Sequence, residues 1–388
     1  MEKMEKMEKT GKTGKVNKNL KKIKKRNKNG KKLILFILIL VFILASYFAI
    51  KVTDDMGIFK EDIVTSVYPG TSTYGFAFKN SYYYSTADGL KSVNVNGKEH
   101  NIDQTQLIST FVRGMNEPIF LKSDKTSLVY DISGKTAVLF NENKMIQTFN
   151  FDREIITAKM TKNGRFVFVI NDSGAKAVVR AYDESGFELF CWFSGVGYVA
   201  DAALSNQKDT MAVITNEVEN GAITSKIFFF DLKQSEPFLQ KTISDKICSY
   251  LSYSKDGCLM ICDNGLYYIS DMGLIEQAMD FSGKNVKEFK SFTNGDIIVC
   301  YEGQDNSKYT AEVFNTKGRR TKKFTISAFD KISDISDDKF LVIRRKEAVS
   351  FSKNGRVLKT IPSDFEIRTT SYFRNRVSIL GNDSLVIK

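Results

Sequence analysis

Few side chains in this sequence can carry acid–base or nucleophilic chemistry. His100 is the only histidine of the 388 residues, and it lies in the phrase Gly-Lys-Glu-His-Asn, where we expect an exposed position on an outer strand. A serine–histidine–aspartate triad would have to use this imidazole, and the chain contains no Gly-x-Ser-x-Gly phrase. The sequence therefore predicts no catalytic residue of this type.

Phosphate, metal and cofactor signatures are also missing from the sequence. Gly134, Lys135 and Thr136 follow one another, but Val129 stands where a phosphate-binding loop has its first glycine. We therefore expect a hairpin turn there. No Asp-x-Asp-x-Asp-Gly calcium loop occurs, and no cysteine spacing is typical of a zinc site. We expect neither a metal nor a cofactor.

The five cysteines are an odd number, so they cannot all pair. Cys258 and Cys262 fall on one face of one expected strand, about 13 Å apart, too far to bridge each other. We expect mainly unpaired, buried thiols that act as small apolar side chains. The cysteines are Cys191, Cys248, Cys258, Cys262 and Cys300.

Positive charge is concentrated at the N-terminus. Residues 1–32 contain 14 Lys/Arg and three Glu, whereas residues 33–388 contain 43 basic and 42 acidic side chains. The remainder is thus almost neutral, which argues against a nucleic-acid partner. The segment 1–32 is of low complexity and has little to bury, so we expect a disordered cytoplasmic tail. Its lysines are either a topology signal or a contact with anionic lipid.

Residues 33–50 (LILFILILVFILASYFAI) form an uncharged apolar run of 18 residues. As a helix this run would span about 27 Å, close to the hydrocarbon thickness of a bilayer. The run is longer than the apolar region of a cleaved signal peptide, and no small-x-small cleavage site ends it. We predict an uncleaved, single-pass plasma-membrane anchor that leaves residues 51–388 outside the cell.

Beyond residue 50, short β-branched and aromatic runs alternate with Gly/Asn/Asp turns, which predicts an all-β fold. A phrase of four strands recurs along the chain. The turn between its first two strands falls near Asn80, Lys125, Gly164, Asp209, Gly257, Gly295, Asp338 and Asn375. Four-stranded repeats of about 40–50 residues are typical of a β-propeller.

The phrases Tyr253–Ile261 (YSKDGCLMI) and Met160–Ile170 (MTKNGRFVFVI) resemble the Ser-x-Asp-Gly-x-hydrophobic phrase of WD-repeat-type and TolB-like propellers. The layout of basic tail, anchor and propeller also resembles an uncharacterised family of bacterial surface proteins. The resemblance implies a fold and a location but no activity. Trp192, the only tryptophan, is followed by Phe, so the Trp-Asp ending of true WD repeats is missing.

Counting strands predicts how the ring closes. Seven repeats have four strands each, whereas the eighth, residues 369–388, has three. We expect Asp62–Tyr68 to supply its missing outermost strand, giving eight four-stranded blades in residues 62–388 after a linker at 51–61. The alternative is a seven-bladed ring. Closure of this kind would turn the first-to-second strand turns toward the membrane and the second-to-third strand loops outward.

Two loops, Glu217–Ser225 and Glu302–Lys308, and the link Asp103–Glu117 interrupt the pattern of tight turns. All should lie on the outward face, where loops on a rigid scaffold bind ligands. The candidate binding residues are Glu217, Glu219, Asn220, Glu302, Asp305 and Arg113.

Two hypotheses for the function follow. The leading one is a membrane-anchored, extracytoplasmic propeller that binds a protein or an envelope polysaccharide as a scaffold or binding module. The alternative is a surface carbohydrate-active enzyme, a glycosidase or lyase that uses Asp/Glu pairs. Asp201, on an expected inner strand, could reach a central channel, although a structural hydrogen-bond role is the more common one for such a residue.

Overall fold

The computed structural model contains two compact units, residues 1–61 and 62–388. The structure describes residues 39–46, 63–66, 75–86, 89–94, 112, 114–142, 144–195, 197–219, 221–255, 257–303, 307–373 and 376–388. In the first unit, residues 39–46 form a helix. No described helix is long and apolar enough to cross a membrane. The rest of the predicted anchor, the tail and His100 lie outside the described residues.

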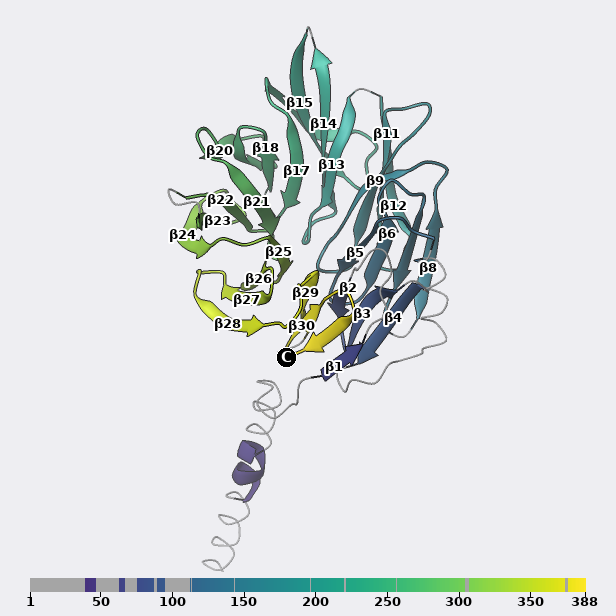
Figure 1. Cartoon of the computed structure of the whole chain (residues 1–388). Helices are drawn as coiled ribbons and strands as arrows, with labels where there is room; N and C mark the ends of the chain where they lie inside the picture. The colour runs from purple at the N-terminus through teal and green to yellow at the C-terminus, as the bar shows by residue number, and fades with distance from the viewer. Residues whose placement is uncertain are drawn as a thin grey trace, which may run out of the picture. The chain divides into compact units, whose positions relative to one another are not determined.

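The second unit consists of eight antiparallel sheets, which are the blades of a β-propeller (Figure 1). Blade one holds β2 (Gly75–Phe78), β3 (Ser81–Thr86) and β4 (Gly89–Asn94). Blade two holds β5 (Pro118–Lys122), β6 (Ser127–Asp131), β7 (Thr136–Phe140) and β8 (Met145–Asn150). Blade three holds β9 (Ile155–Met160), β10 (Phe166–Ile170), β11 (Ala177–Tyr182) and β12 (Glu188–Ser194). Blade four holds β13 (Tyr198–Leu204), β14 (Thr210–Glu219), β15 (Ala222–Asp231) and β16 (Pro237–Ser244).

The other half of the ring has the same organisation. Blade five holds β17 (Cys248–Tyr253), β18 (Gly257–Cys262), β19 (Gly265–Ser270) and β20 (Ile275–Asp280). Blade six holds β21 (Val286–Ser291), β22 (Ile297–Glu302), β23 (Lys308–Phe314) and β24 (Arg320–Ser327). Blade seven holds β25 (Lys331–Ile335), β26 (Lys339–Arg344), β27 (Glu347–Ser352) and β28 (Val357–Pro362). Blade eight holds β29 (Thr369–Phe373), β30 (Arg376–Leu380), β31 (Ser384–Ile387) and β1 (Ile63–Ser66).

The predicted turns and the predicted ring closure are both confirmed. All eight marker positions fall between, or at the edge of, the first two strands of a blade. The strand β1 pairs antiparallel with β31, with Val64 opposite Val386 and Thr65 opposite Leu385. The fold is therefore the eight-bladed ring, and the seven-bladed alternative is wrong. The turn predicted at Gly134 is also confirmed, because it joins β6 to β7.

The core lies between the blades. The second strand of most blades is buried on both faces, as in β10 and β18, because neighbouring blades cover it from either side. In the outermost strands, more buried and more exposed side chains alternate instead, and β16 buries only Ile243 fully. This arrangement explains the high aromatic content, because large side chains such as Phe168 and Phe340 fill the space between sheets.

Strand direction defines two faces of the ring. We call the end of the blades with the first-to-second and third-to-fourth strand turns the turn face. The opposite end, with the second-to-third strand hairpins and the connections between blades, is the loop face. The strand β1 is the outermost of its blade and therefore begins at the turn face.

A β-bulge recurs in the innermost strands of blades three to seven. In three blades an acidic residue follows the bulge and accepts a hydrogen bond from the innermost strand of the next blade. Asp201 binds the amide of Leu251 at 2.7 Å, Glu288 that of Ile332 at 2.7 Å, and Asp334 that of Tyr372 at 2.9 Å. These carboxylates hold neighbouring blades together.

The prediction of mainly unpaired cysteines holds for three of the five, but Cys248 and Cys262 form a disulfide that was not expected. These two residues face each other across β17 and β18. Without the bulge in β17, Cys262 would face Ser249, so the pairing depends on a one-residue shift of register. Cys191, Cys258 and Cys300 are free thiols, and the last two are buried as expected.

Candidate functional site

The exposed large hydrophobic side chains of the described propeller residues fall into two groups, one on each face. The loop-face apolar group surrounds blade four and contains Phe193, Tyr198, Val218, Ile223 and Ile247. The turn-face apolar group lies at or next to third-to-fourth strand turns and contains Phe187, Phe238, Met272, Leu274, Val357 and Leu358. Exposed apolar surface is a marker of contact with another molecule.

The loop-face group is centred on a projecting hairpin. The strands β14 and β15 have 10 residues each, whereas the innermost strand β13 has seven. Their outer ends, which we call the ribbon (residues 217–223), extend beyond the last residues that pair with β13 and β16. Figure 1 shows β14 and β15 reaching past their neighbours.

The ribbon corrects the predicted loop at Glu217–Ser225, since the strands continue almost to the tip. Only residues 220 and 221 separate β14 from β15, and Gly221 has a φ of 80°. An Asn-Gly pair between two alternating runs is a strong hairpin signal, because both positions of the favoured turn need positive φ. This signal could have been found in the sequence.

The two faces of the ribbon differ in chemistry. On the face toward blade three, Lys226 pairs with Glu217 and, at 2.6 Å, with Glu219. On the face toward blade five, Val218 lies opposite Ile223, and these side chains are 70% and 41% exposed. The ribbon is therefore amphipathic, with an uncovered aliphatic pair near its tip.

Hydrogen bonds fix the base of the ribbon to blade five. Asn216 Nδ2 donates to the carbonyl oxygen of Cys248 at 3.0 Å, and the amide of Cys248 donates to Ser225 Oγ at 3.0 Å. Ser225 Oγ also donates to the carbonyl oxygen of Lys246 at 2.8 Å. Because Cys248 is itself held by the disulfide, the ribbon stands on a rigid support.

The structure brings together only some of the predicted binding residues. Glu217 and Glu219 share Lys226 on the ribbon. Glu302 ends β22 on the same face but in blade six, and its amide donates to the carbonyl of Asn285 at 3.0 Å. Asn220, Asp305 and Arg113 lie outside the described residues. The apolar residues Val218 and Ile223 were missed, although they alternate with the polar residues around them.

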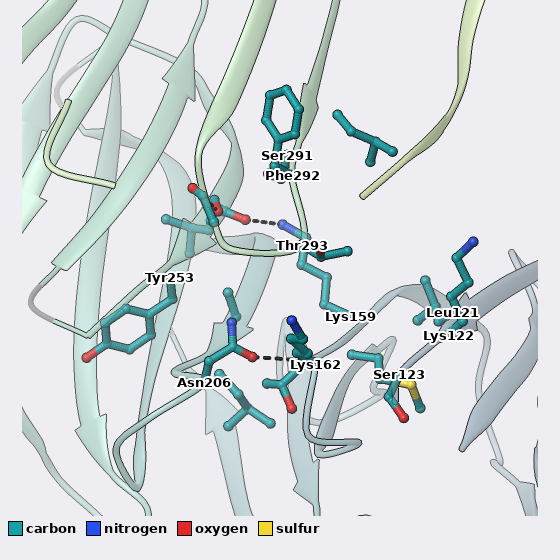
Figure 2. A pocket seen from close by; sticks show the side chains of 18 of the residues that line it. Leu121, Lys122, Ser123, Lys159, Lys162, Asn206, Tyr253, Ser291, Phe292 and Thr293 are labelled. Atoms are coloured by element: carbon teal, nitrogen blue, oxygen red, sulfur yellow. Dashed lines mark hydrogen bonds between the residues drawn. The ribbon is translucent and has the colours of Figure 1, made fainter. Parts of the chain in front are cut away.

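A cavity of about 740 Å³ occupies the turn-face end of the central channel (Figure 2). Inner strands contribute Lys122, Lys159 and Ser291, and the first-to-second strand turns contribute Asn206 and Thr293. Asn206 Oδ1 accepts a hydrogen bond of 2.9 Å from the backbone amide of Lys162. The cavity lies in the size range of small-ligand pockets, but its lining is rich in hydroxyl and charged groups.

The buried acids of this cavity are engaged by the protein itself. Asp201 lines it, as predicted, and pairs with Lys159 while its carboxylate also accepts the amides of Leu251 and Ala202. Burial raises the pKa of Asp201, and Lys159 opposes that rise. Asp334 receives Lys122 Nζ at 3.0 and 2.9 Å on its two oxygens. These contacts give Asp201 and Asp334 a structural role in joining neighbouring blades.

An ion pair crosses the mouth of the cavity. Lys162 of blade three lies 2.6 Å from Asp337 of blade seven, on the opposite side of the ring, and Thr293 Oγ1 also donates to Asp337. Burial alone would raise the pKa of Asp337, but the hydrogen bonds from Lys162 and Thr293 hold it below its ordinary value. The mouth is therefore bridged by side chains of opposite charge.

The fold and these two surfaces define a β-propeller of the kind used as a scaffold or binding module. Residues 58–385 match the Family of unknown function (DUF5711), and the chain belongs to that family. A search of curated proteins finds no relative of this chain.

Solved structures with a similar fold include other propellers. Sqt1 from Saccharomyces cerevisiae superposes with a TM-score of 0.55 at 11% identity, covering 83% of this chain and 97% of that one. BamB from Moraxella catarrhalis superposes with a TM-score of 0.43 at 8% identity, covering 84% of this chain and 99% of that one. The C-terminal WD40 domain of Sif2 superposes with a TM-score of 0.39 at 9% identity, covering 70% of this chain and 97% of that one. At 11% identity the likeness to Sqt1 concerns the fold alone, and the predicted resemblance to WD-repeat-type propellers is confirmed at that level.

Proposed function

We propose that this protein is a membrane-anchored, extracytoplasmic binding module whose ligand is a protein that docks on the ribbon. The observation that carries the proposal is the exposed pair Val218 and Ile223 on a projecting, braced hairpin. Exposed aliphatic side chains beside charged ones are typical of a protein interface, with an apolar centre and a polar rim. A polysaccharide would instead favour flat aromatic surfaces, such as Phe193 and Tyr198 beside the ribbon, but the projecting pair itself is aliphatic. We therefore favour a protein over the polymer alternative.

Two features support the proposed location. The described part of the apolar run, residues 39–46, is a helix whose side chains from Ile39 to Leu44 are each 48–73% exposed. A helix that is apolar on all sides needs an apolar surrounding, which a bilayer supplies. The Cys248–Cys262 disulfide favours an oxidising compartment outside the cytoplasm. The lysine tail would then remain in the cytoplasm, where it could contact anionic lipid.

Photo-crosslinking in intact cells tests the docking site. A photoreactive amino acid placed at Val218 or Ile223 in the full-length chain should give one discrete adduct. Thr360, an exposed residue on β28, supplies the matched control position and should give none. Adducts of equal yield at all three positions, or at none of them, would refute docking on the ribbon.

Protease protection tests the location separately. Protease added to intact cells with a permeable envelope should degrade residues 62–388 and spare the N-terminal tail. Complete protection of the propeller under these conditions would refute the extracytoplasmic location and leave the docking site to be judged by crosslinking.

A further inference from the structure

The turn-face apolar group consists of separate exposed side chains, each at or next to a third-to-fourth strand turn, rather than one continuous patch. We call these side chains the apolar tips. Phe187 stands at the third-to-fourth strand turn of blade three and is 69% exposed. Met272, in the corresponding turn of blade five, is 91% exposed. Val357 and Leu358 begin β28 in blade seven and are each 51% exposed. Phe238 and Leu274 occupy similar positions in blades four and five. Half of the ring therefore carries apolar tips on this one face.

The chain enters the propeller from the same face. The strand β1 begins at Ile63 and is the outermost strand of blade eight, so its first residue lies at the turn face. Eleven linker residues, 51–61, separate this unit from the apolar run. Such a linker spans at most about 40 Å even when fully extended. If residues 33–50 cross a bilayer, the start of β1, at the turn face, stays within about 40 Å of that bilayer.

We propose that the turn face rests on the lipid bilayer, with the turn-face apolar group in the interfacial layer. This proposal depends on the membrane anchor of the proposed function. Apolar tips spread over several blades fit a broad, continuous surface, which can contact distant points at once, whereas a protein partner needs a contiguous patch. A bilayer has this geometry and takes up apolar and aromatic side chains at its interface.

The side chains beside the tips are compatible with lipid headgroups. Arg356 and Lys359 flank Val357 and Leu358 and are exposed, so they can reach phosphate groups while the apolar pair inserts. The cavity lies at the centre of the same face, where its charged and hydroxyl side chains can remain hydrated. The loop-face ribbon would then point away from the membrane, where a protein ligand can approach it.

Quenching by brominated lipid tests this contact. The full-length chain is reconstituted into nanodiscs whose phosphatidylcholine carries bromine near the carboxyl end of its acyl chains for the propeller positions, and near the methyl end for position 42, which lies at the middle of the apolar run. Trp192 is first replaced by Phe, and single tryptophans are then introduced as Met272→Trp, Leu358→Trp, Val218→Trp and Phe42→Trp. Phe42 lies in the helix 39–46 and reports insertion of the anchor. Val218 lies on the opposite face of the ring and serves as the matched exposed control.

We expect strong quenching at Phe42→Trp, a clear loss of emission at Met272→Trp and Leu358→Trp, and none at Val218→Trp. Quenching at Phe42→Trp with none at the two turn-face positions would overturn the proposal while leaving the anchor intact. Equal quenching at positions 272, 358 and 218 would also overturn it, because the propeller would then have no fixed face. Lack of quenching at Phe42→Trp would overturn both the anchor and the contact that depends on it.

Discussion

The carboxylate of Asp201 on β13 accepts a hydrogen bond of 2.7 Å from the amide of Leu251 on β17 and also pairs with Lys159 on β9. One buried side chain thus joins the innermost strands of blades three, four and five. This contact favours the structural role over the catalytic one for Asp201, since the amides of Leu251 and Ala202 and the ammonium of Lys159 all bind its buried carboxylate.

Replacing Asp201 with Asn should destabilise the propeller. The amide keeps the size of the side chain, but it leaves Lys159 without a counter-charge and weakens the bond to Leu251. We expect a loss of about 1–3 kcal/mol in the free energy of unfolding, measured with urea. Glu219→Gln, which disturbs an exposed pair, should have a clearly smaller effect. Equal effects of the two substitutions would contradict the role of Asp201 as an inter-blade contact.

The ring closure predicts that proline substitutions at two neighbouring positions of β1 have unequal effects on stability. In an antiparallel ladder, alternate amides point to the partner strand. Only one of Val64 and Thr65 should therefore donate to β31, since no strand in the described part of the chain pairs with the other side of β1. One of Val64→Pro and Thr65→Pro should lower the thermal midpoint clearly, and the other should have little effect. Two small effects of equal size would show that this strand does not close the ring.

Chain truncation tests the same strand. A chain that starts at residue 62 should fold cooperatively, whereas one that starts at residue 71 should lose stability or aggregate, because the edge of β31 is left open. Circular dichroism and light scattering on the two chains measure this difference. Equal stability would argue against closure through β1.

The disulfide predicts how many cysteines can be alkylated before and after reduction. Alkylation of protein denatured without reductant should modify three cysteines, and five after reduction. In the chain-entropy model a bridge that closes a loop of about 15 residues contributes about 3 kcal/mol. Cys248→Ser combined with Cys262→Ser should lower stability by a comparable amount, whereas Cys191→Ser should have a small effect. Modification of all five cysteines without reductant would contradict the pairing.

Features of the fold that depend on neighbouring residues in the chain could be predicted from the sequence, whereas features that depend on contacts between distant strands could not. Turn residues such as Gly164 reveal the repeat, and a strand count at the two ends was sufficient to predict β1 against β31. The Cys248–Cys262 pair could not be predicted in the same way, because a bulge in β17 moves the register by one residue. The ring-crossing pair of Lys162 and Asp337 depends on how the blades close, which no local pattern records.

The pair of Lys162 and Asp337 should make a small contribution to stability that depends on pH. The lowered pKa of Asp337 means that its folded state holds the proton less tightly than the unfolded state. Its contribution is therefore present above the ordinary value of 3.8 and is lost as the pH falls through the lower, folded pKa. Both side chains are partly exposed, so we expect less than about 1 kcal/mol at neutral pH.

Thermal unfolding of the wild type and of Asp337→Asn, followed from pH 7 downward, measures this dependence. The difference between the two midpoints should shrink below about pH 4, where the carboxyl becomes protonated. A difference that stays constant or grows on acidification would mean that Lys162 does not hold Asp337 in the charged form.

The ribbon variant Val218→Asp with Ile223→Asp should fold normally but bind poorly. Both side chains lie beyond the paired parts of β13 and β16, so the cost in stability should be limited to the lost cross-strand pair and the repulsion between the two charges, about 1 kcal/mol. Placing charge at the apolar centre of an interface typically weakens binding by tenfold or more, which corresponds to about 1.4 kcal/mol.

A photoreactive amino acid at Ile247, beside the ribbon, measures docking most directly in intact cells. The fraction of chain converted to the discrete adduct is compared among the wild type, the double variant Val218→Asp/Ile223→Asp, and Phe187→Asp on the opposite face. We predict that the double variant loses most of the adduct, up to about nine-tenths for a tenfold weaker interaction far from saturation, while Phe187→Asp keeps it. An unchanged adduct in the double variant, or an equal loss in Phe187→Asp, would contradict the assignment of the ribbon as the docking surface.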